Sequence, residues 1–312
     1  MRLATAFRYE QSISNLQQRQ QDLSTAQMQL TSGKRVNAAS DDPTAAARAE
    51  RALASIARSD ADKRAVDASK NAMTIAESVL GDAVELMQSA RETIVAAGNG
   101  TYSPSERQAL AAKLSEIRKQ LLSVSNRPDG GGGYVFGGQG ATQPPFVESS
   151  ATVPNTVTFQ GQPGQIEAAS TEKVNLTLDG ERIWMFGREQ DGTLSNVNVF
   201  DALATAISDL NDPAITGSAA QATVNQGLSD LDKILGNVQS ARSEVGEMLN
   251  RMDGIEGRLA VSKLAAQTEK SNAEDLDMVE AFSQFQNKET GYEAALQSYA
   301  SIQKMSLFQY IS

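Results

Sequence analysis

The segment VDASKNAMTIAESVLGDAVELMQSARETIVAA, residues 66–97, repeats its large apolar side chains every seven positions. The second seam position of the same repeat is small throughout, which allows a partner helix to approach closely. Ile75, Val79 and Leu86 widen the apolar face, so we expect more than one neighbouring helix. The large seam residues are Val66, Met73, Leu80, Met87 and Ile94, and the small ones are Ser69, Ala76, Ala83, Ala90 and Ala97.

The stretch LTSGKRVNAASDDPTAAA, residues 30–47, predicts where one helix ends and the next begins. Gly33 can adopt the left-handed conformation that closes a helix. Asp42 can cap the following helix, and Pro43 suits its first turn because the missing N–H is not needed there. The sequence therefore predicts one helix from about Leu3 to Ser32 and a second from Pro43 to about Ala97.

A third helix is predicted by the motif Ser103-Pro104-Ser105-Glu106, which forms a capping box with Pro at the first helical position. Its apolar residues also recur in heptad steps, and we expect it to end at Arg127-Pro128.

Composition changes after the third helix. The stretch PDGGGGYVFGGQGATQPPF, residues 128–146, is rich in Gly and Pro and indicates loops. Val174, Leu176 and Leu178 alternate as in a strand, Asp179-Gly180 suits a hairpin turn, and 183–186 would form the returning strand. We therefore expect a small β-domain over 138–196.

Helical periodicity returns at Phe200, and a long heptad stripe then runs from Val224 to Leu259, interrupted by Arg242 and Glu256. The order of elements is nearly palindromic about the β-domain, so the chain is expected to fold back on itself. We predict a mainly α fold, in which the N- and C-terminal halves form a long antiparallel helical bundle or coiled coil with an inserted small β-domain.

This layout predicts three domains. The terminal assembly helices would cover 1–40 and 272–312, the helical core would cover 41–137 and 197–271, and the outer β-domain would cover 138–196. The terminal stripes are only one side wide, and isolated helices of this kind are marginal in water because most helical stability comes from packing. From the residues alone, these stripes could equally well form the ordinary core of one stable monomeric bundle or pack between subunits. The candidate assembly residues are Ile13, Leu16, Leu23, Leu30, Phe282, Phe285, Tyr292, Leu296 and Tyr299.

Composition narrows the function classes. The 312-residue chain has a net charge of −10, which disfavours nucleic-acid or anionic-membrane partners. It contains neither Cys nor His, so thiol nucleophiles, imidazole bases and their metal sites are excluded. The first residues lack the pattern of a cleaved signal peptide, which by itself indicates a cytoplasmic protein. We expect no enzyme activity, no cofactor and no metal site.

Three stretches carry weak chemical signals. Asp41-Asp42 could be a carboxylate pair, but a helix cap explains it better. Glu274, Asp275 and Asp277 lack the glycine of a calcium loop, so a solvated face is favoured. The glycines of 130–140 match no phosphate-binding motif, so a linker is favoured there.

Three separated stretches carry a family resemblance. LTSGKRVNAASDDPTAAA (30–47) resembles the segment that joins the terminal helix to the helical core in bacterial flagellins and their relatives. LQSYASIQKMSLFQYIS (296–312) and GGYVFGGQGATQPPF (132–146) resemble the hook–filament junction members of that family. The matches occur in the family's order and cover both ends and the middle of the chain.

The resemblance implies a structural subunit of the flagellum that leaves the cell unfolded through the flagellar type III export channel, without signal cleavage. This implication replaces the cytoplasmic expectation with an extracellular one. It also implies terminal helices that are disordered in the free monomer and order on assembly, and a β-domain that faces outward. The implied partners are further copies, neighbouring hook-associated proteins, and an export chaperone on the C-terminal helix.

Alternatives remain at this point. Filament flagellin belongs to the same family, although the ending with Phe308 and Tyr310 is unlike that of flagellins. A secreted coiled-coil adhesin or effector would instead use the β-domain to bind a host ligand. An enzyme within the β-insertion is poorly supported without His or Cys.

Overall fold

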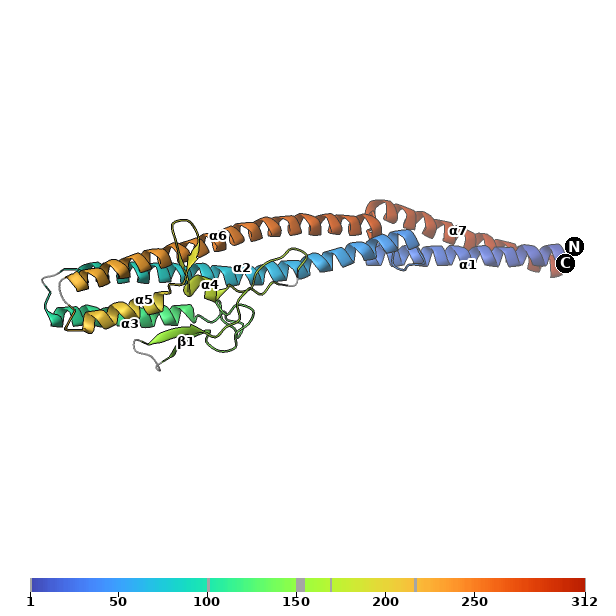
Figure 1. The fold of residues 1–312 in the computed structure, drawn as a ribbon. Helices are drawn as coiled ribbons and strands as arrows, with labels where there is room; N and C mark the ends of the chain where they lie inside the picture. Colours follow the sequence, from blue (N-terminus) through green and yellow to red (C-terminus); the bar gives the residue numbers. More distant parts are fainter. Residues whose placement is uncertain (1, 100–101, 150–154, 169, 216–217, 312) are drawn as a thin grey trace. The chain divides into compact units, whose positions relative to one another are not determined.

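The computed structural model describes residues 2–99, 102–149, 155–168, 170–215 and 218–311, with the side chains of residue 7 and of most residues from 10 to 301. The described part is mainly helical, which confirms the predicted fold class (Figure 1). The helices are α1 Arg2–Ser32, α2 Pro43–Ala97, α3 Pro104–Ser125, α4 Gly180–Trp184, α5 Val199–Asn211, α6 Ser218–Glu274 and α7 Met278–Ile311; the strands are β1 Phe146–Ser149, β2 Thr156–Phe159, β3 Gly187–Arg188 and β4 Leu194–Ser195.

The chain divides into two compact units. We call residues 60–259 the core unit, and residues 1–59 together with 260–312 the terminal unit. Both long helices, α2 and α6, contribute to each unit. The insertion therefore lies in the same compact unit as the helices around it, and the three-domain division of the sequence stays a prediction.

In the core unit, the seam predicted on α2 is buried as expected. All five large seam residues and all five small ones are at most 5% exposed. All of them except the polar Ser69 belong to one continuous apolar core that also includes residues of α3, α5 and α6. Burying apolar surface contributes about 25 cal/mol for each Å² removed from water, so this seam is a main source of the unit's stability.

Ion pairs join α2 to α6 along the core unit. The cation lies on α2 in the pairs Lys63–Glu256 (2.7 Å), Lys70–Asp253 (2.6 Å) and Arg91–Asp232 (3.0 Å). One pair is reversed, because Glu77 on α2 accepts from Arg242 on α6 at 2.6 Å. The two charged residues that interrupt the α6 stripe, Arg242 and Glu256, thus both pair with α2. As the α2 partner advances from 63 to 91, the α6 partner retreats from 256 to 232, so the two helices run antiparallel.

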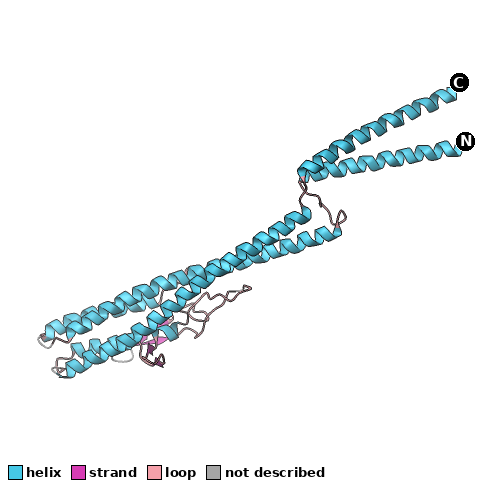
Figure 2. Ribbon diagram, turned by 90° about the horizontal axis from the view of Figure 1, so that it is seen from above, coloured by secondary structure: helices cyan, strands magenta, loops and turns pink. Residues whose placement is uncertain are grey.

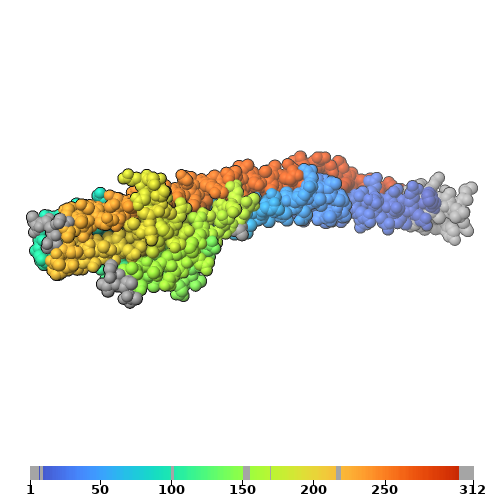
Figure 3. Space-filling view, viewed as in Figure 1, coloured from blue at the N-terminus to red at the C-terminus, as the bar shows by residue number. Residues whose placement is uncertain are grey.

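The insertion contains less strand than the sequence predicts. Its two sheets are short antiparallel pairs, β1 with β2 (Phe146 opposite Phe159) and β3 with β4 (Gly187 opposite Ser195). In the space-filling view the insertion covers one side of the helices of its own unit (Figure 3). The ion pair of Lys233 with Glu189 (2.8 Å) ties the β3–β4 hairpin to α6.

Two strand predictions in the insertion are wrong. Residues 174–178 form a loop, and the alternation there arises because Val174 and Leu178 point into the core, each less than 5% exposed. The returning strand predicted at 183–186 is wrong as well, because α4 includes Ile183 and Trp184. The predicted hairpin turn at Asp179-Gly180 is the start of this helix, with the Asp179 side chain accepting from the N–H of Arg182. A Cβ on Gly180 would lie 2.2 Å from the carbonyl oxygen of Phe136, so only glycine fits this helix start.

Aromatic side chains hold the insertion to the bundle. Trp184 of α4 packs edge-on against Phe136 at 5.4 Å between ring centroids, and is stacked with Phe200 of α5 at 6.3 Å. Phe146 of β1 lies 6.0 Å from Phe200 and 5.2 Å from Phe159 of β2. Since Trp184 is fully buried, this cluster gives the insertion a core shared with the helices.

Arg118 of α3 connects the same elements through polar contacts. It is only 8% exposed, and its Nε donates to the carbonyl oxygen of Phe200 at 2.9 Å. One terminal nitrogen donates to the carbonyl oxygen of Asn155 at 2.9 Å, and the other pairs with the carboxylate of Glu148 on β1. This bond to Arg118 holds the pKa of Glu148 below its ordinary value.

The terminal unit has a different construction. Its helices α1 and α7 lie side by side with the two chain ends at the same end of the pair (Figures 1 and 2). None of the helices in the described part of the chain is long and apolar enough to span a membrane.

Candidate assembly surface

The candidate residues on α1 and α7 are covered only in part. Ile13, Leu16, Leu23 and Leu30 are half-buried, as α1 packs against α7. On α7, Phe285, Tyr292 and Tyr299 are also half-buried, whereas Phe282 is 55% exposed and Leu296 is 43% exposed. The structure therefore brings seven of the nine predicted residues into partial cover and leaves two open to solvent.

The terminal unit has no large side chain in its interior, as far as its side chains are described. The buried residues there are alanines, one valine and one serine, whereas the core unit buries Trp184 and several Phe, Met and Leu side chains completely. Small residues remove little apolar surface from water, so they offset little of the entropy lost on ordering two long helices. The buried set is Ala26, Val36, Ala45, Ala49, Ala52, Ser59, Ala266 and Ala273.

Large apolar side chains are instead on the outside of this unit. Of the twelve that the described part of the chain exposes, nine belong to the terminal unit, which holds little more than a third of the residues. Large exposed apolar patches mark interaction sites in soluble proteins. The nine are Phe7, Met28, Leu53, Val261, Leu264, Met278, Val279, Phe282 and Leu296.

Sequence reasoning found only two of these nine. The others lie outside the heptad stripes from which we chose candidates, for example Val261, Leu264 and Val279, which are 64–84% exposed. The sequence does contain a signal for them, because a large apolar residue outside the heptad stripe indicates a second contact face of the helix. A search for such surplus apolar positions would have identified them.

An elbow, which we define as residues 33–42 with 275–277, connects the helices of the terminal unit. Gly33 closes α1 with φ +69°, the left-handed conformation that the sequence predicts. Its carbonyl oxygen accepts from the N–H of Leu276 at 3.0 Å, and the carbonyl oxygen of Glu274 accepts from the N–H of Arg35 at 2.7 Å. These reciprocal bonds satisfy backbone groups that the helix ends leave free.

Charged side chains brace the same elbow. Lys34 pairs with Glu274 at 3.3 Å, and Arg35 pairs with Asp42 at 3.2 Å. Arg35 also donates to the carbonyl oxygen of Ala273 at 2.9 Å, next to the end of α6. Ion pairs that are exposed to solvent add little to stability, so these pairs orient the crossing segments more than they stabilise them.

The acidic candidates at the elbow have structural partners. Asp41 accepts from the N–H groups of Asn37 and Ala38, and Asp42 caps α2 by accepting from the N–H of Ala45 at 3.0 Å. On the other segment, Asp277 accepts from N–H groups in the first turn of α7. Among the described residues, no group of three or more acidic side chains could hold a metal ion.

Asp42 is the carboxyl group whose titration reports on this cap. Hydrogen bonds from the Ala45 N–H and the Thr44 hydroxyl, with Arg35 alongside, lower the pKa of Asp42 from 3.8 to about 2. A carboxyl with a lowered pKa stabilises the folded form above its ordinary pKa, and this contribution disappears as the pH falls from about 4 through about 2.

We therefore expect the side-chain carbon of Asp42 to titrate in NMR with a midpoint near pH 2. The Asp42→Asn variant should retain α2, since Asn also caps helices, but lose the weakening of the elbow between pH 4 and pH 2. A midpoint near 4 in the wild-type chain would contradict this assignment.

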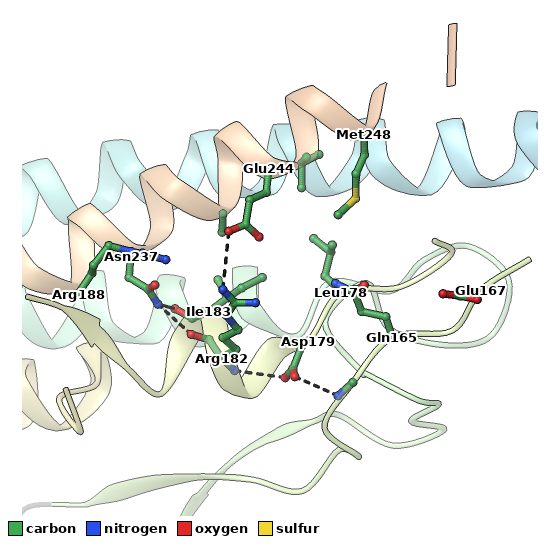
Figure 4. A pocket seen from close by; sticks show the side chains of 13 residues that line it. Gln165, Glu167, Leu178, Asp179, Arg182, Ile183, Arg188, Asn237, Glu244 and Met248 are labelled. Carbon is green, nitrogen blue, oxygen red and sulfur yellow. Dashed lines mark hydrogen bonds and ion pairs between the residues drawn. The ribbon is translucent and has the colours of Figure 1, made fainter. Parts of the chain in front are cut away.

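The other chemical candidates are also structural. In the glycine-rich loop, Asp129 accepts from the N–H groups of Gly131 and Gly133, so these amides are not available to a phosphate. A pocket of about 350 Å³ lies between the insertion and α6 in the core unit (Figure 4). There Asn237, only 3% exposed, donates to the carbonyl oxygens of Arg182, Ile183 and Phe186, which joins α4 to α6.

Comparisons with known proteins agree with the sequence resemblance. Residues 4–141 match the bacterial flagellin N-terminal helical region, and residues 228–311 match the bacterial flagellin C-terminal helical region. The chain is 30% identical to flagellar hook-associated protein 3 of Salmonella typhimurium, over 99% of both chains. It is 26% identical to a flagellin of Bacillus subtilis, over 82% of this chain and 81% of the flagellin. The fold is similar to that of hook-associated protein 3 from Legionella pneumophila, with a TM-score of 0.62, 18% identity, and coverage of 70% and 97% of the two chains.

Proposed function

The chain belongs to the bacterial flagellin family, and on that premise we propose that it is a structural, non-enzymatic subunit of the junction between hook and filament. The observation that carries this proposal is the end-to-end similarity to hook-associated protein 3 of Salmonella typhimurium, which covers 99% of both chains. The flagellin of Bacillus subtilis matches at lower identity and over less of each chain. Filament flagellin is therefore the weaker alternative.

The terminal unit supports assembly through the chain ends. Among its described side chains, this unit exposes large apolar ones and fully buries only small ones, so it gains stability when another surface covers it. We infer that terminal helices of neighbouring copies, or of neighbouring hook-associated proteins, provide that surface. Folding of the ends and polymerisation are then coupled, and the ends are disordered in the free chain.

Helix α7 supports the same mechanism in its heptad pattern. Phe285, Tyr292 and Tyr299 recur every seven residues and are half-buried where α7 packs against α1. Phe282 and Leu296 lie fourteen residues apart on the second seam position and stay exposed. A coiled-coil seam uses both positions, so Phe282 and Leu296 are available to a further helix.

We further propose that the subunit reaches its place by export of the unfolded chain through the flagellar type III system, and that it resides outside the cell. In this scheme the outer β-domain of residues 138–196 faces away from the axis of the assembly. The domain division of the sequence analysis, with terminal helices 1–40 and 272–312 and a core of 41–137 and 197–271, belongs to the same proposal.

The deciding experiment is deletion of the gene, followed by a swimming assay and electron microscopy of the hooks. Loss of the junction subunit should leave hooks without attached filaments, with filament protein released into the medium, and expression of this chain should restore swimming. A filament subunit would instead be missing from the medium as well. A secreted adhesin or effector, the alternative from another class, would leave swimming intact.

A second prediction concerns the export chaperone. The exposed apolar side chains of α7 would need shielding before secretion, so we propose that the chaperone binds the C-terminal helix. Deleting residues 275–312 should abolish chaperone binding in a pull-down assay, whereas the matched deletion of residues 1–32 should preserve it. Binding retained without residues 275–312 would refute the assignment.

A further inference from the structure

One loop of the insertion crosses both long helices at the end of the core unit. We define residues 170–175 as the strap. Thr171 lies over α2, where its N–H donates to Asp62 Oδ1 at 3.0 Å and its hydroxyl donates to Asp62 Oδ2 at 2.6 Å. The next residue, Glu172, accepts two bonds from Arg258 Nη2 on α6, at 2.7 and 2.8 Å. Two consecutive strap residues thus hold the two helices.

A second attachment lies further along the same loop. The hydroxyl of Ser69 on α2 donates to the carbonyl oxygen of Asn175. The Asn175 side chain in turn contacts the sulfur of Met248 on α6 at 3.7 Å. Between them, Val174 is 4% exposed and belongs to the apolar core, so the strap is packed as well as hydrogen-bonded.

The α2 sequence is adapted to this loop. Asp62 and Ser69 occupy the heptad position that is Ala at 76, 83, 90 and 97. Both polar residues are buried, Asp62 at 8% and Ser69 at 0% exposure, and the strap is the partner of each. A buried carboxylate or hydroxyl is costly unless it is hydrogen-bonded, so these two positions require the strap. Where α2 has Ala in this series, its seam instead joins the apolar core formed with the other helices.

The strap also marks a boundary. Asp62 and Arg258 lie within three residues of the two ends of the core unit, at 60 and 259. Helix ends and loosely packed segments open more readily than packed cores, and they open as contiguous cooperative units.

From these contacts we propose that the strap is a clamp, which closes the α2–α6 pair and stops local unfolding from entering the core unit. The insertion therefore has a conformational role in the single chain in addition to the outer surface it provides. The clamp is a property of the free subunit, so an experiment that fails to find it leaves the proposed place in the flagellum untouched.

Hydrogen–deuterium exchange of the full-length chain, followed by mass spectrometry, tests the clamp. The double variant Thr171→Val, Glu172→Gln removes the hydroxyl donor and the carboxylate charge with little change in volume. We expect amides of residues 60–70 and 250–259 to exchange at least tenfold faster than in wild type, while amides of 80–97 stay unchanged. Lys173→Gln is the matched control, because the ion pair that Lys173 forms among the described residues, with Glu167 at 3.1 Å, lies within the insertion.

Unchanged exchange at 60–70 and 250–259 would overturn the proposal. Equal acceleration throughout residues 60–259 would also overturn it, since that result means loss of global stability without a local barrier. Should the double variant fail to fold, Glu172→Gln alone still tests the contact with Arg258. The same amides are measured, and the expected acceleration is smaller.

Discussion

Replacing Phe282 and Leu296 with Asp is expected to abolish incorporation of the subunit, leaving hooks without filaments and non-swimming cells. Each side chain is at least 43% exposed in the single chain, so the substitution costs the free subunit little. In the proposed assembly both residues become buried, and full burial of a Phe or Leu contributes roughly 1.5–3 kcal/mol. Losing both contributions, and burying two carboxylates in their place, should weaken assembly by more than a hundredfold.

Swimming and electron microscopy measure the outcome, with circular dichroism of the purified chain as a check on folding. Leu194→Asp is the matched control, since Leu194 on β4 is 42% exposed and Leu296 is 43% exposed. The control should swim normally. Normal filaments on cells that carry the double substitution would show that this face of α7 stays uncovered in the flagellum.

The second large effect is expected for Arg118→Met in the core unit. The substitution retains much of the apolar stem but leaves the carbonyl oxygens of Phe200 and Asn155 without this donor, and Glu148 without its cation. Breaking a buried ion pair by removing one partner costs about 3–5 kcal/mol. Because Glu148 keeps some access to solvent, we expect about 3 kcal/mol, which lowers the melting temperature by roughly 6–12 °C for a unit of this size.

The pH dependence separates the ion pair from simple packing loss. Arg118 lowers the pKa of Glu148 from its ordinary 4.5, so the pair stabilises the wild type above that pH and loses its effect below it. The difference between wild type and Arg118→Met should therefore shrink as the pH falls below about 4. Lys113→Met, at an exposed position of α3, should change the free energy of unfolding by less than about 0.5 kcal/mol. A difference that is independent of pH would contradict a role for Glu148.

Helical parts of the fold were predictable because their signals are local. The seven-residue period is enough to predict the α2 seam from Val66 to Ile94. The caps at Gly33, Asp42 and Ser103 each depend on residues only a few positions away. The predicted limits of α2 coincide with those of the structure. The heptad pattern does not show whether the helix that packs on a terminal stripe belongs to the same chain or to another copy, because that is not a local property.

The insertion was harder because distant residues decide its conformation. Asp179-Gly180 fits a hairpin turn and a helix cap equally well, and burial of Trp184 against Phe136 and Phe200 favours the helix. Asn237, more than fifty residues further along the chain, then accommodates the carbonyl groups at the end of α4. Because Phe136, Phe200 and Asn237 lie outside 174–186, the apolar alternation within that segment predicts strands where the structure has a loop and a helix.

The reversed ion pair, Glu77 with Arg242, has a consequence for the alignment of α2 with α6. Seven-residue repeats look the same after a displacement of one heptad, so the apolar seam alone would tolerate sliding. A displaced alignment would separate Arg242 from Glu77. In the other three pairs described above the cation lies on α2, so none of them could replace this pair. Exposed ion pairs add little to stability, so these four pairs mainly fix the alignment of the two helices. Every copy then folds with the same alignment of α2 and α6, which the proposed assembly of identical subunits requires.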